Sequence, residues 1–349
     1  MLIVGMKHWQ MYGTKYSLEI FLVVIDRERQ SMEFRESKYL IFDTPKKLSI
    51  KFIIKWILAK VASPYYKVMY WWTAPKIRQK KYTVSICAIF RDEGAYLKEW
   101  LEYHLLIGVD HFYLYNNFSK DNYLEILNPY IEKGVVTLTD WPIPQGQMAA
   151  FADCAEKYSE ETNWIGYIDL DEYVVPNHDN NIKDLLAKFT KRPLVLIYWL
   201  YFTSSGHLYR NNENLLTEDF TVCWKKYADI GKLFFNTAYD YADDLPRNQH
   251  MHHRWARVGN HVLPPVNVFD KVCAWGENPV PTDDMPAQIN HYVIKSYQEY
   301  GEKKKRGGGV HKDMHDEQYF WEHELMSAKA DYHIFKYIIL LKKKLNGYK

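Results

Sequence analysis

Three carboxylates stand close together in the stretch WIGYIDLDEYVVP, residues 164–176: Asp169, Asp171 and Glu172. They directly follow a run of apolar residues, and buried carboxylates are rare unless another group pairs with them. Side chains two apart in a strand share one face, with Cα atoms roughly 6.5 Å apart. Two carboxylates placed in this way repel each other, so a metal, a basic side chain or water must accompany them.

The chain before this stretch alternates between strand and helix patterns. Apolar runs predict strands at 82–90, 110–116, 135–141 and 164–171, and helical spacing predicts helices at 93–108, 121–134 and 147–161. This alternation is typical of parallel strands joined by crossover helices, a sheet in which ligands bind beyond the carboxyl ends of the strands. Asp169 and Asp171 are therefore expected to close the fourth strand at the ligand-binding edge.

The rest of the chain predicts a more mixed structure. After Pro176 we expect a helix at 181–189 and strands at 193–202, 232–238 and 249–258. We expect residues 1–80 to form an N-terminal segment. Its sequence predicts strands at 19–26 and 38–42, a basic amphipathic helix at 46–62 and a linker at 71–81. Residues 81–310 would form the main domain, and residues 311–349 a basic helical tail that includes KYIILLKKKL, residues 336–345.

Composition and charge exclude several classes of protein. The formal net charge is +2, which gives no general support for nucleic-acid binding. The four cysteines form no CxxC pair, and Cys87 and Cys154 fall in segments predicted to be buried, which suits a reducing compartment. No signal-peptide pattern and no run of about 18 uncharged apolar residues occurs. We expect a cytoplasmic protein, peripheral to the inner face of the plasma membrane if its basic amphipathic helices bind anionic lipid rather than simply lying at the surface.

The carboxylates suit a divalent cation better than the common alternatives. The sequence contains no GxGxxG after the first strand, no GxxxxGK[ST] phosphate loop and no GxSxG nucleophile motif. An Asp-x-Asp at the end of a parallel strand suits Mn²⁺ or Mg²⁺, which take carboxylate, phosphate and water oxygens. Such a metal would neutralise a diphosphate leaving group while a glycosidic bond breaks.

Four segments in order carry a resemblance to a known family. They are ICAIFRDEGAYLKEWLEYHLLIGVDHFYLYNNFSKD (86–121), QGQMAAFADC (145–154), WIGYIDLDEYVVP (164–176) and INHYVIKSYQEYGEKKKRG (289–307). Together, over about residues 82–310, they resemble glycosyltransferase family 92 and related family-2-like enzymes. The resemblance implies an α/β fold of the GT-A type, with a mainly parallel central sheet flanked by helices. It also implies a UDP-sugar donor and an inverting, metal-dependent transfer.

The resemblance also implies roles for individual residues. Asp169, Asp171 and His291 would form the metal site, with Asp169 facing the ribose or a metal-bound water. Asp92 stands where the family commonly has asparagine. The residues expected to contact the donor are Arg91, Asp92, Glu93, Asn116, Asn117, Gln147, Asp169, Lys232 and Lys295, the two lysines as cations for the diphosphate.

An inverting transfer needs a base that takes the proton of the acceptor hydroxyl. The segment LLTEDF, residues 215–220, offers Glu218 and Asp219, of which Glu218 is our choice; the alternative is that they are carboxylates at a helix start. Trp199, Phe202 and Gly206 are expected to shape the sugar pocket, with His253 near the acceptor. The alternative interpretation of the histidine group is a zinc site formed by His250, His252, His253 and His261.

The sequence therefore predicts a glycosyltransferase that moves a hexose to a cell-surface glycan, such as lipopolysaccharide, capsule or another lipid-linked oligosaccharide. A nucleotidyltransferase shares the metal, the nucleotide and the sheet, but FRDEGAY lacks the glycine- and lysine-rich signature expected after its first strand. A carbohydrate-binding protein that keeps a degenerate transferase fold is the second alternative.

Overall fold

The computed structural model describes residues 50–347, apart from residue 77 and the segments 242–253, 275–283 and 308–315. The strands predicted at 19–26 and 38–42 and the residues His250, His252 and His253 lie outside the described residues. Of the strand predicted at 249–258, the described part forms only β10 (Ala256–Val258), which pairs with two short neighbours.

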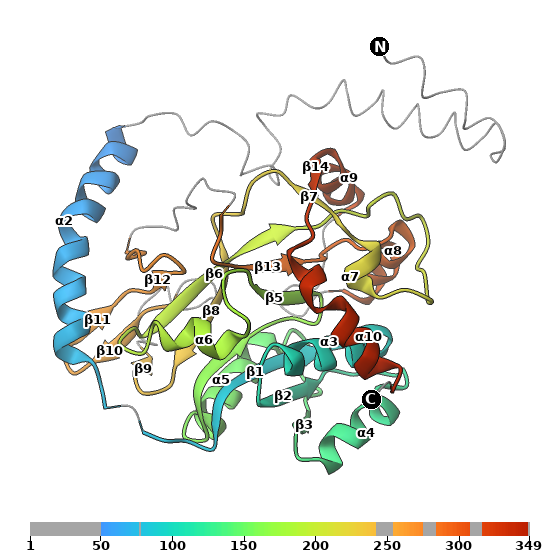
Figure 1. The fold of residues 1–349 in the computed structure, drawn as a ribbon, viewed down its shortest axis with the longest axis horizontal. Coiled ribbons are helices and arrows are strands. Elements are labelled where there is room, and N and C mark those ends of the chain that lie inside the picture. The colour runs from blue at the N-terminus through green and yellow to red at the C-terminus, as the bar shows by residue number, and fades with distance from the viewer. Residues whose placement is uncertain (1–49, 77, 242–253, 275–283, 308–315, 348–349) are drawn as a thin grey trace. The chain divides into compact units, whose positions relative to one another are not determined.

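A mixed sheet lies at the centre of the described residues (Figure 1). Its strand order is β3-β2-β1-β4-β8-β6-β13-β5, and β12 pairs with β6. The first four strands in this order pair in parallel, β8 is antiparallel to both of its neighbours, and β13 is parallel to β6. The strands of this sheet are β1 (Tyr82–Phe90), β2 (His111–Asn116), β3 (Val136–Asp140), β4 (Thr162–Tyr167), β5 (Glu172–Pro176), β6 (Leu194–Tyr201), β8 (Gly231–Asn236), β12 (Val266–Asn267) and β13 (Ala287–His291).

The helices and the remaining strands surround this sheet. The helices are α2 (Ile50–Thr73), α3 (Gly94–Leu106), α4 (Tyr123–Glu132), α5 (Gln147–Tyr158), α6 (Ile182–Ala187), α7 (Leu216–Asp219), α8 (Tyr297–Arg306), α9 (Glu317–Leu325) and α10 (Ile338–Leu345), with the 3₁₀ helix η4 (His333–Tyr337). The small sheets contain β7 (Val222–Trp224) with β14 (Ser327–Ala330), and β9 (Asp240–Tyr241), β10 and β11 (His261–Leu263). This α/β architecture, with a mainly parallel centre and flanking helices, confirms the predicted fold class.

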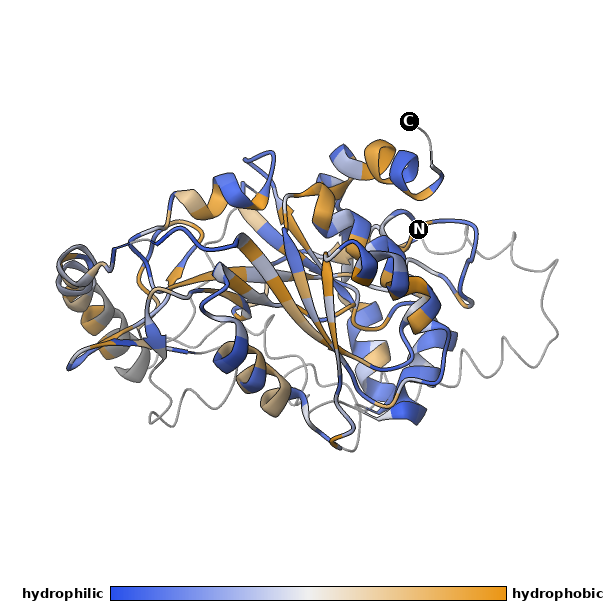
Figure 2. Cartoon of the chain, turned by 90° about the horizontal axis from the view of Figure 1, so that it is seen from below, coloured by the Kyte–Doolittle hydropathy of each residue, from blue (hydrophilic) through white to orange (hydrophobic). Residues whose placement is uncertain are grey.

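The central strands are apolar because both faces of the sheet are covered. Strand β1 lies between β2 and β4, and Cys87 stands opposite Tyr113 on one side and Tyr167 on the other. All three side chains are buried. Figure 2 shows the hydrophobic strands in the middle with helices above and below them. Cys154 of α5 is buried as well, as predicted.

The fourth strand is shorter than predicted, and this changes the setting of the acidic stretch. Strand β4 ends at Tyr167, although the backbone amide of Ile168 still donates to the Cys87 carbonyl at 3.1 Å. The chain then turns, and β5 starts at Glu172 on the far edge of the sheet. Asp169 and Asp171 therefore lie in a connection between two strands, and the prediction that they share one strand face is wrong.

The two flanking regions also differ from the prediction. Helix α2 continues to Thr73, through the start of the predicted linker at 71–81. The predicted helical tail contains a strand, β14, which pairs antiparallel with β7, and α10 packs against α3. Ser49–Lys349 form one compact unit. None of the helices in the described ranges has both the length and the hydrophobicity of a membrane span.

Candidate active site

A cavity of about 220 Å³ lies beside the connection between β4 and β5. This is below the range of roughly 300–1,000 Å³ that is usual for small-molecule sites, so it has room for part of a large ligand. It brings together three carboxylates, three strongly basic side chains and one imidazole. The lining residues are Ile89, Phe90, Arg91, Glu93, Asn117, Gln147, Asp169, Leu170, Asp171, His291, Lys303, Arg306 and Gly307.

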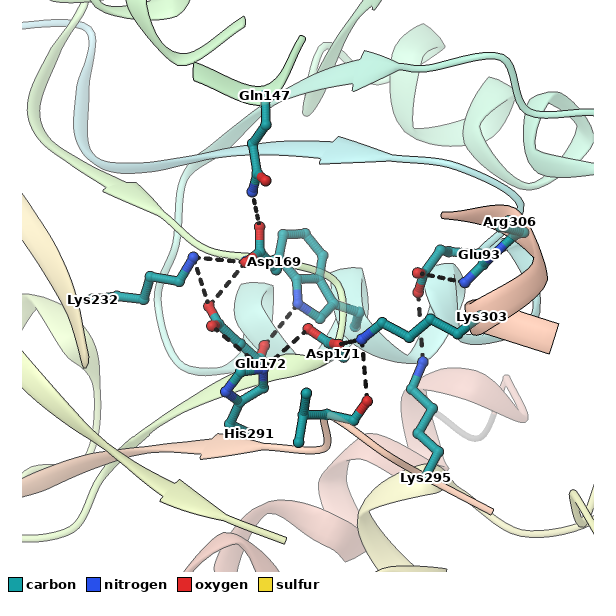
Figure 3. A network of polar contacts seen from close by, with 12 residues as sticks. Glu93, Gln147, Asp169, Asp171, Glu172, Lys232, His291, Lys295, Lys303 and Arg306 are labelled. Carbon is teal, nitrogen blue, oxygen red and sulfur yellow. Dashed lines mark hydrogen bonds and ion pairs between the residues drawn. The ribbon is translucent and has the colours of Figure 1, made fainter. Parts of the chain in front are cut away.

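Both oxygens of the Asp169 carboxylate are engaged by neighbouring side chains (Figure 3). Lys232 Nζ donates to Oδ2 at 2.7 Å, and Nε2 of Gln147, the first residue of α5, donates to Oδ1 at 2.8 Å. Lys232 is buried and also lies 3.5 Å from Glu172 Oε2. Burial alone would lower the pKa of Lys232, but Asp169 and Glu172 raise it above its ordinary value. Lys232 is therefore a buried counter-ion for two carboxylates and does not line the cavity.

Glu172, the last of the three carboxylates in the acidic stretch, is fully buried. Burial raises the pKa of its carboxyl group, and the neighbouring charges of Asp169 and Asp171 add to this, with Lys232 opposing them. Its Oε2 accepts the backbone N–H of Asp169 at 3.0 Å. Its Oε1 has no hydrogen-bond partner among the described residues and lies 3.9 Å from His291 Nε2. Burial thus outweighs the positive charge of Lys232 and keeps the pKa of this carboxyl group above its ordinary value.

Asp171 lies between a lysine and a histidine. Its Oδ2 accepts a hydrogen bond of 2.6 Å from Lys303 Nζ, and its Oδ1 lies 3.7 Å from His291 Nε2. Burial would raise the pKa of Asp171, but the positive charge of Lys303 outweighs it and holds the pKa well below its usual range. Burial lowers the pKa of His291 to about 3, although Asp171 opposes this. At neutral pH the site therefore presents a carboxylate beside a neutral imidazole.

Asp171 and His291 are suitable ligands for the predicted metal, whereas Asp169 is not placed to join them. A carboxylate oxygen and a neutral imidazole nitrogen at 3.7 Å can both face one divalent cation. Mg²⁺ and similar ions usually take only one or two protein carboxylates and complete their shell with phosphate and water. The described residues contain no group of three or more His, Cys, Asp or Glu side chains arranged for a metal ion. The donor set thus fits a metal that shares its shell with a phosphorylated ligand.

The donor residues predicted after the first strand divide into two groups. Arg91 and Glu93 line the cavity, and Asp92 does not. Glu93 lies 3.5 Å from Lys295 Nζ and 3.3 Å from Arg306 Nη2. Lys295 is itself buried, so the prediction that it faces a diphosphate is not supported. Arg306 donates to the carbonyls of Arg91 and Asp92 at 2.5 and 2.6 Å and thereby holds this loop.

Three other residues that were predicted to contact the donor form hydrogen bonds within the chain. Asp92 lies in the left-handed region with a φ of 49°, and its Oδ1 accepts the N–H of Lys120 at 2.7 Å. The Asn116 amide donates to Asp140 Oδ1 at 3.0 Å, and Asn116 does not line the cavity. Asn117 does line it, but its amide donates to two backbone carbonyls of the connection between β3 and α5. These polar groups hold loops at the carboxyl ends of β1 and β2.

The predicted base lies outside the cavity. Glu218 Oε2 accepts the N–H of Leu215 at 3.3 Å in the first turn of α7, and Oε1 lies 2.5 Å from Lys342 Nζ. The Asp219 carboxylate accepts the Asn214 amide at 2.8 Å. Neither residue is among those that line the cavity. Both carboxylates thus stabilise a helix start, which was the alternative interpretation.

Among the described residues, the predicted acceptor residues Trp199, Phe202 and Gly206 do not line the cavity. Trp199 is buried against the ring of His291, with centroids 4.7 Å apart, and helps to fix that imidazole. Phe202 packs in the core against Tyr292, and Gly206 lies in the loop after β6. His253 lies outside the described residues.

The structure adds two charged cavity residues that the sequence interpretation did not select, Lys303 and Arg306 of α8. They stand three apart in GEKKKRG, a spacing that places side chains on one face of a helix. Ser296 caps this helix by accepting the Glu299 N–H at 3.3 Å, so the start of α8 is fixed. The spacing was visible in the sequence, but it did not tell which face of α8 points inward.

A protein-family model covers most of the chain. Residues 80–333 match the model of glycosyltransferase family 92. The chain belongs to glycosyltransferase family 92. The predicted resemblance is thereby confirmed, and its range extends beyond residue 310. The two cations of α8 fall within the matched range.

The family 92 chain is similar to curated plant proteins over part of their length. It is 33% identical over 119 residues to a glycosyltransferase family 92 protein of Oryza sativa subsp. japonica, covering 34% of this chain and 20% of that protein. It is 30% identical over 172 residues to a family 92 protein of Ricinus communis, covering 47% and 31%. The matches thus span a fifth to a third of these relatives.

Solved structures are similar to the family 92 chain at a lower level. Staphylococcus aureus TarS in complex with UDP has a TM-score of 0.31 and 13% identity, over 45% of this chain and 47% of that one. Mycobacterium tuberculosis glucosyl-3-phosphoglycerate synthase, solved with Mn²⁺ and UDP, has a TM-score of 0.25 and 16% identity, over 34% and 44%.

Proposed function

We propose that this family 92 chain transfers a hexose from a UDP-sugar to a glycan hydroxyl, with the donor diphosphate bound in the cavity beside Asp171. One observation carries the proposal. Asp171 Oδ1 and His291 Nε2 converge to 3.7 Å on one side of the cavity, while Arg91, Lys303 and Arg306 line it as well. Ligands for a metal and cations for phosphate therefore meet at one site.

Asp171 and His291 would hold Mn²⁺ or Mg²⁺ in this reaction. When bound, the metal supplies positive charge against the diphosphate as the sugar leaves. The low pKa of His291, about 3, keeps its imidazole neutral and its lone pair available throughout the physiological range. The packing of the ring against Trp199 and Tyr201, at 4.7 and 5.2 Å between centroids, orients it toward Asp171.

Basic side chains of α8 would bind the diphosphate directly. Lys303 and Arg306 are basic side chains that already line the cavity, so they would reach a diphosphate there without a change in the backbone. Lys232 and Lys295 would not share this role, because both are buried beside a carboxylate, at 2.7 and 3.5 Å, and neither lines the cavity. Asp169, held by Lys232 and Gln147, would act as a fixed acceptor for a donor hydroxyl.

The finer features of the reaction rest on the family resemblance. We propose a single displacement with inversion at the sugar carbon: the acceptor oxygen forms the new glycosidic bond as the bond to the diphosphate oxygen breaks, the diphosphate leaves with the electron pair, and the hydroxyl proton passes to solvent. We propose as acceptor a cell-surface glycan, either lipid-linked or part of a growing polysaccharide.

Calorimetric binding of UDP tests the proposal. The native chain is expected to bind UDP more tightly with Mn²⁺ than without it, and Asp171→Asn should lose the Mn²⁺-dependent part. Asp179→Asn is the matched control, because that carboxylate pairs with Lys188 at 2.6 Å and does not line the cavity. Hydrolysis of a panel of UDP-sugars would then identify the hexose. Failure of the native chain to bind UDP under both conditions would contradict the proposal.

Two further assays, run beside the UDP-sugar panel, separate the two alternative functions. A nucleotidyltransferase would release pyrophosphate from a nucleoside triphosphate in the presence of a sugar phosphate. A carbohydrate-binding protein would bind glycans and turn over neither substrate. Either result, with no transfer from any UDP-sugar, would replace the proposed function.

A further inference from the structure

One face of α2 exposes large apolar side chains over most of the helix. They are between 46% and 78% exposed, and the two most C-terminal of them are tryptophans. Most follow one another at intervals of three or four, so they share a face of the helix. The side chains are Ile54, Ile57, Leu58, Val61, Tyr65, Val68, Trp71 and Trp72.

A different face of the same helix is attached to the rest of the chain. Tyr70 is fully buried, and its hydroxyl donates to the Pro264 carbonyl at 2.8 Å. The guanidinium of Arg192 lies over the Tyr70 ring at 5.0 Å, and Met69 is buried beside it. Figure 1 shows α2 beside β10 and β11, the strands that precede Pro264. The apolar side chains are thus held outward by the packing of Tyr70.

The charge of this part of the sequence is strongly one-sided. Lysine and arginine occur eleven times between Asp43 and Asp92, and no aspartate or glutamate occurs in that interval. The whole chain has 45 basic and 43 acidic residues, so the remainder carries a net negative charge. Four of these lysines belong to α2 itself, which contains no acidic residue. The described side chain of Lys67 is exposed, as are Lys76 and Arg78 just beyond the helix. Positive charge therefore accompanies the exposed apolar face.

From these observations we infer that α2 lies on the surface of a bilayer that contains anionic lipid. An amphipathic helix with exposed aromatic residues and flanking lysines binds at the level of the lipid headgroups. Anionic headgroups attract each basic residue near the surface by about 1 kcal/mol. A protein partner or a second copy of this chain would match the apolar side chains but does not account for the excess of basic residues.

Helices α2 and α10 both combine exposed apolar side chains with lysines, but they differ in how these residues are held. Helix α10 has exposed Ile339 and Leu340 beside a run of lysines, but Ile338 and Leu341 are buried. Lys342 of this run is paired with Glu218 at 2.5 Å. The charged end of α10 is thus partly neutralised within the chain. We therefore assign the lipid contact to α2 and not to α10.

Flotation of the full chain with vesicles tests this inference. The chain is expected to bind vesicles of phosphatidylcholine mixed with phosphatidylglycerol, to bind pure phosphatidylcholine much less, and to dissociate as salt is raised. The double variant Trp71→Ser/Trp72→Ser should weaken binding by about tenfold or more, because two exposed aromatic side chains no longer enter the interface. The control Ile339→Ser/Leu340→Ser, on α10, should bind like the native chain.

Three outcomes would overturn the inference. Binding that depends on Ile339 and Leu340 would assign the contact to α10. Equal binding to neutral and anionic vesicles would remove the role of charge. No vesicle binding, together with self-association that the Trp71→Ser/Trp72→Ser variant abolishes, would show that the face binds a second copy. Circular dichroism and urea denaturation of each variant check folding, and neither measurement depends on the proposed transferase function.

Discussion

Lys303 Nζ lies 2.6 Å from Oδ2 of Asp171, the same carboxylate whose Oδ1 faces His291 Nε2 at 3.7 Å (Figure 3). A positive charge thus already stands on the carboxylate that we propose as a metal ligand. Charges at such a distance interact strongly in a buried site, where the effective dielectric constant is low. Binding of a divalent cation at Asp171 therefore works against Lys303 until a diphosphate offers this lysine another partner.

Replacing Lys303 by methionine should separate metal affinity from nucleotide affinity. We expect Lys303→Met to bind Mn²⁺ alone about tenfold more tightly, since the competing charge is gone, and to bind UDP with Mn²⁺ about tenfold more weakly. Calorimetric titrations of Mn²⁺ and of UDP measure both. Lys304→Met is the matched control, because Lys304 follows on the same helix but is exposed. Parallel changes in the two affinities would contradict this competition.

Replacing Lys232 should affect stability more than ligand binding. Lys232 is the buried partner of Asp169 at 2.7 Å and of Glu172 at 3.5 Å, and its loss leaves two carboxyl groups without a counter-ion. Lys232→Met is therefore expected to lower the free energy of unfolding by about 3–5 kcal/mol, as measured by urea denaturation. Adding Asp169→Asn should restore part of this loss, because it removes one of the uncompensated charges.

The opposite result for Lys232 would favour the role predicted from the sequence. If Lys232→Met changed the unfolding free energy by less than about 0.5 kcal/mol and abolished UDP binding, Lys232 would be a diphosphate ligand. The two readouts are independent, so one set of samples distinguishes a structural counter-ion from a binding residue.

The parallel half of the sheet could be predicted because its strands are covered on both faces. Continuous apolar runs placed β1, β2 and β3 to within one or two residues. The same signal extended the fourth strand too far, because Ile168 and Leu170 are buried although they lie beyond β4. An apolar pattern reports burial, and a buried connection gives the same pattern as a buried strand.

The members of the site could be proposed from motifs, but their contacts depend on pairing across the chain. Strand β13 is antiparallel to β5, and His291 stands opposite Glu172 in this register. This pairing places His291 beside Asp171 across 120 positions of sequence, and no local pattern encodes it. Lys232 was predicted to contact the diphosphate and Lys303 was not selected, since a lysine in the sequence does not show whether it faces a cavity or a buried carboxylate.

Substitutions at Asp92 test whether this residue contacts the donor or only shapes its loop. Its φ of 49° lies in the left-handed region, which asparagine adopts as readily as aspartate, and its Oδ1 accepts the Lys120 N–H at 2.7 Å. Asp92→Asn is expected to keep UDP affinity within about twofold, whereas Asp92→Val should be destabilised by about 1–3 kcal/mol through backbone strain. Calorimetry and urea denaturation measure these effects. A large loss of UDP affinity in a stable Asp92→Asn would restore the predicted donor contact.

A buried histidine outside the site predicts part of the acid sensitivity of the fold. His104 of α3 is fully buried, and burial lowers its pKa to about 3, well below the ordinary value of 6.5. Its Nδ1 lies 2.8 Å from the Trp100 carbonyl, and its Nε2 accepts the Val174 N–H at 3.4 Å, so the neutral ring carries its proton on Nδ1.

The sign of the effect follows from the direction of the pKa shift. Between pH 6.5 and 3 the unfolded chain binds a proton at His104 that the native chain does not, so stability falls as the pH is lowered through this interval. The contribution approaches about 1.4 kcal/mol per pH unit, and His291 and His111, whose pKa values burial lowers to about 3 and 4, add to it.

His104→Gln isolates this contribution. The variant should be less stable at pH 7 because the packing of the ring is lost, but its unfolding free energy should fall less steeply than that of the native chain between pH 6.5 and 4.5. Urea denaturation at several pH values gives the difference in slope, and an NMR titration of the native chain should show no ionisation of the His104 ring from pH 8 to 5. Equal slopes, or a ring that titrates near pH 6.5, would mean that the native fold does not keep His104 neutral.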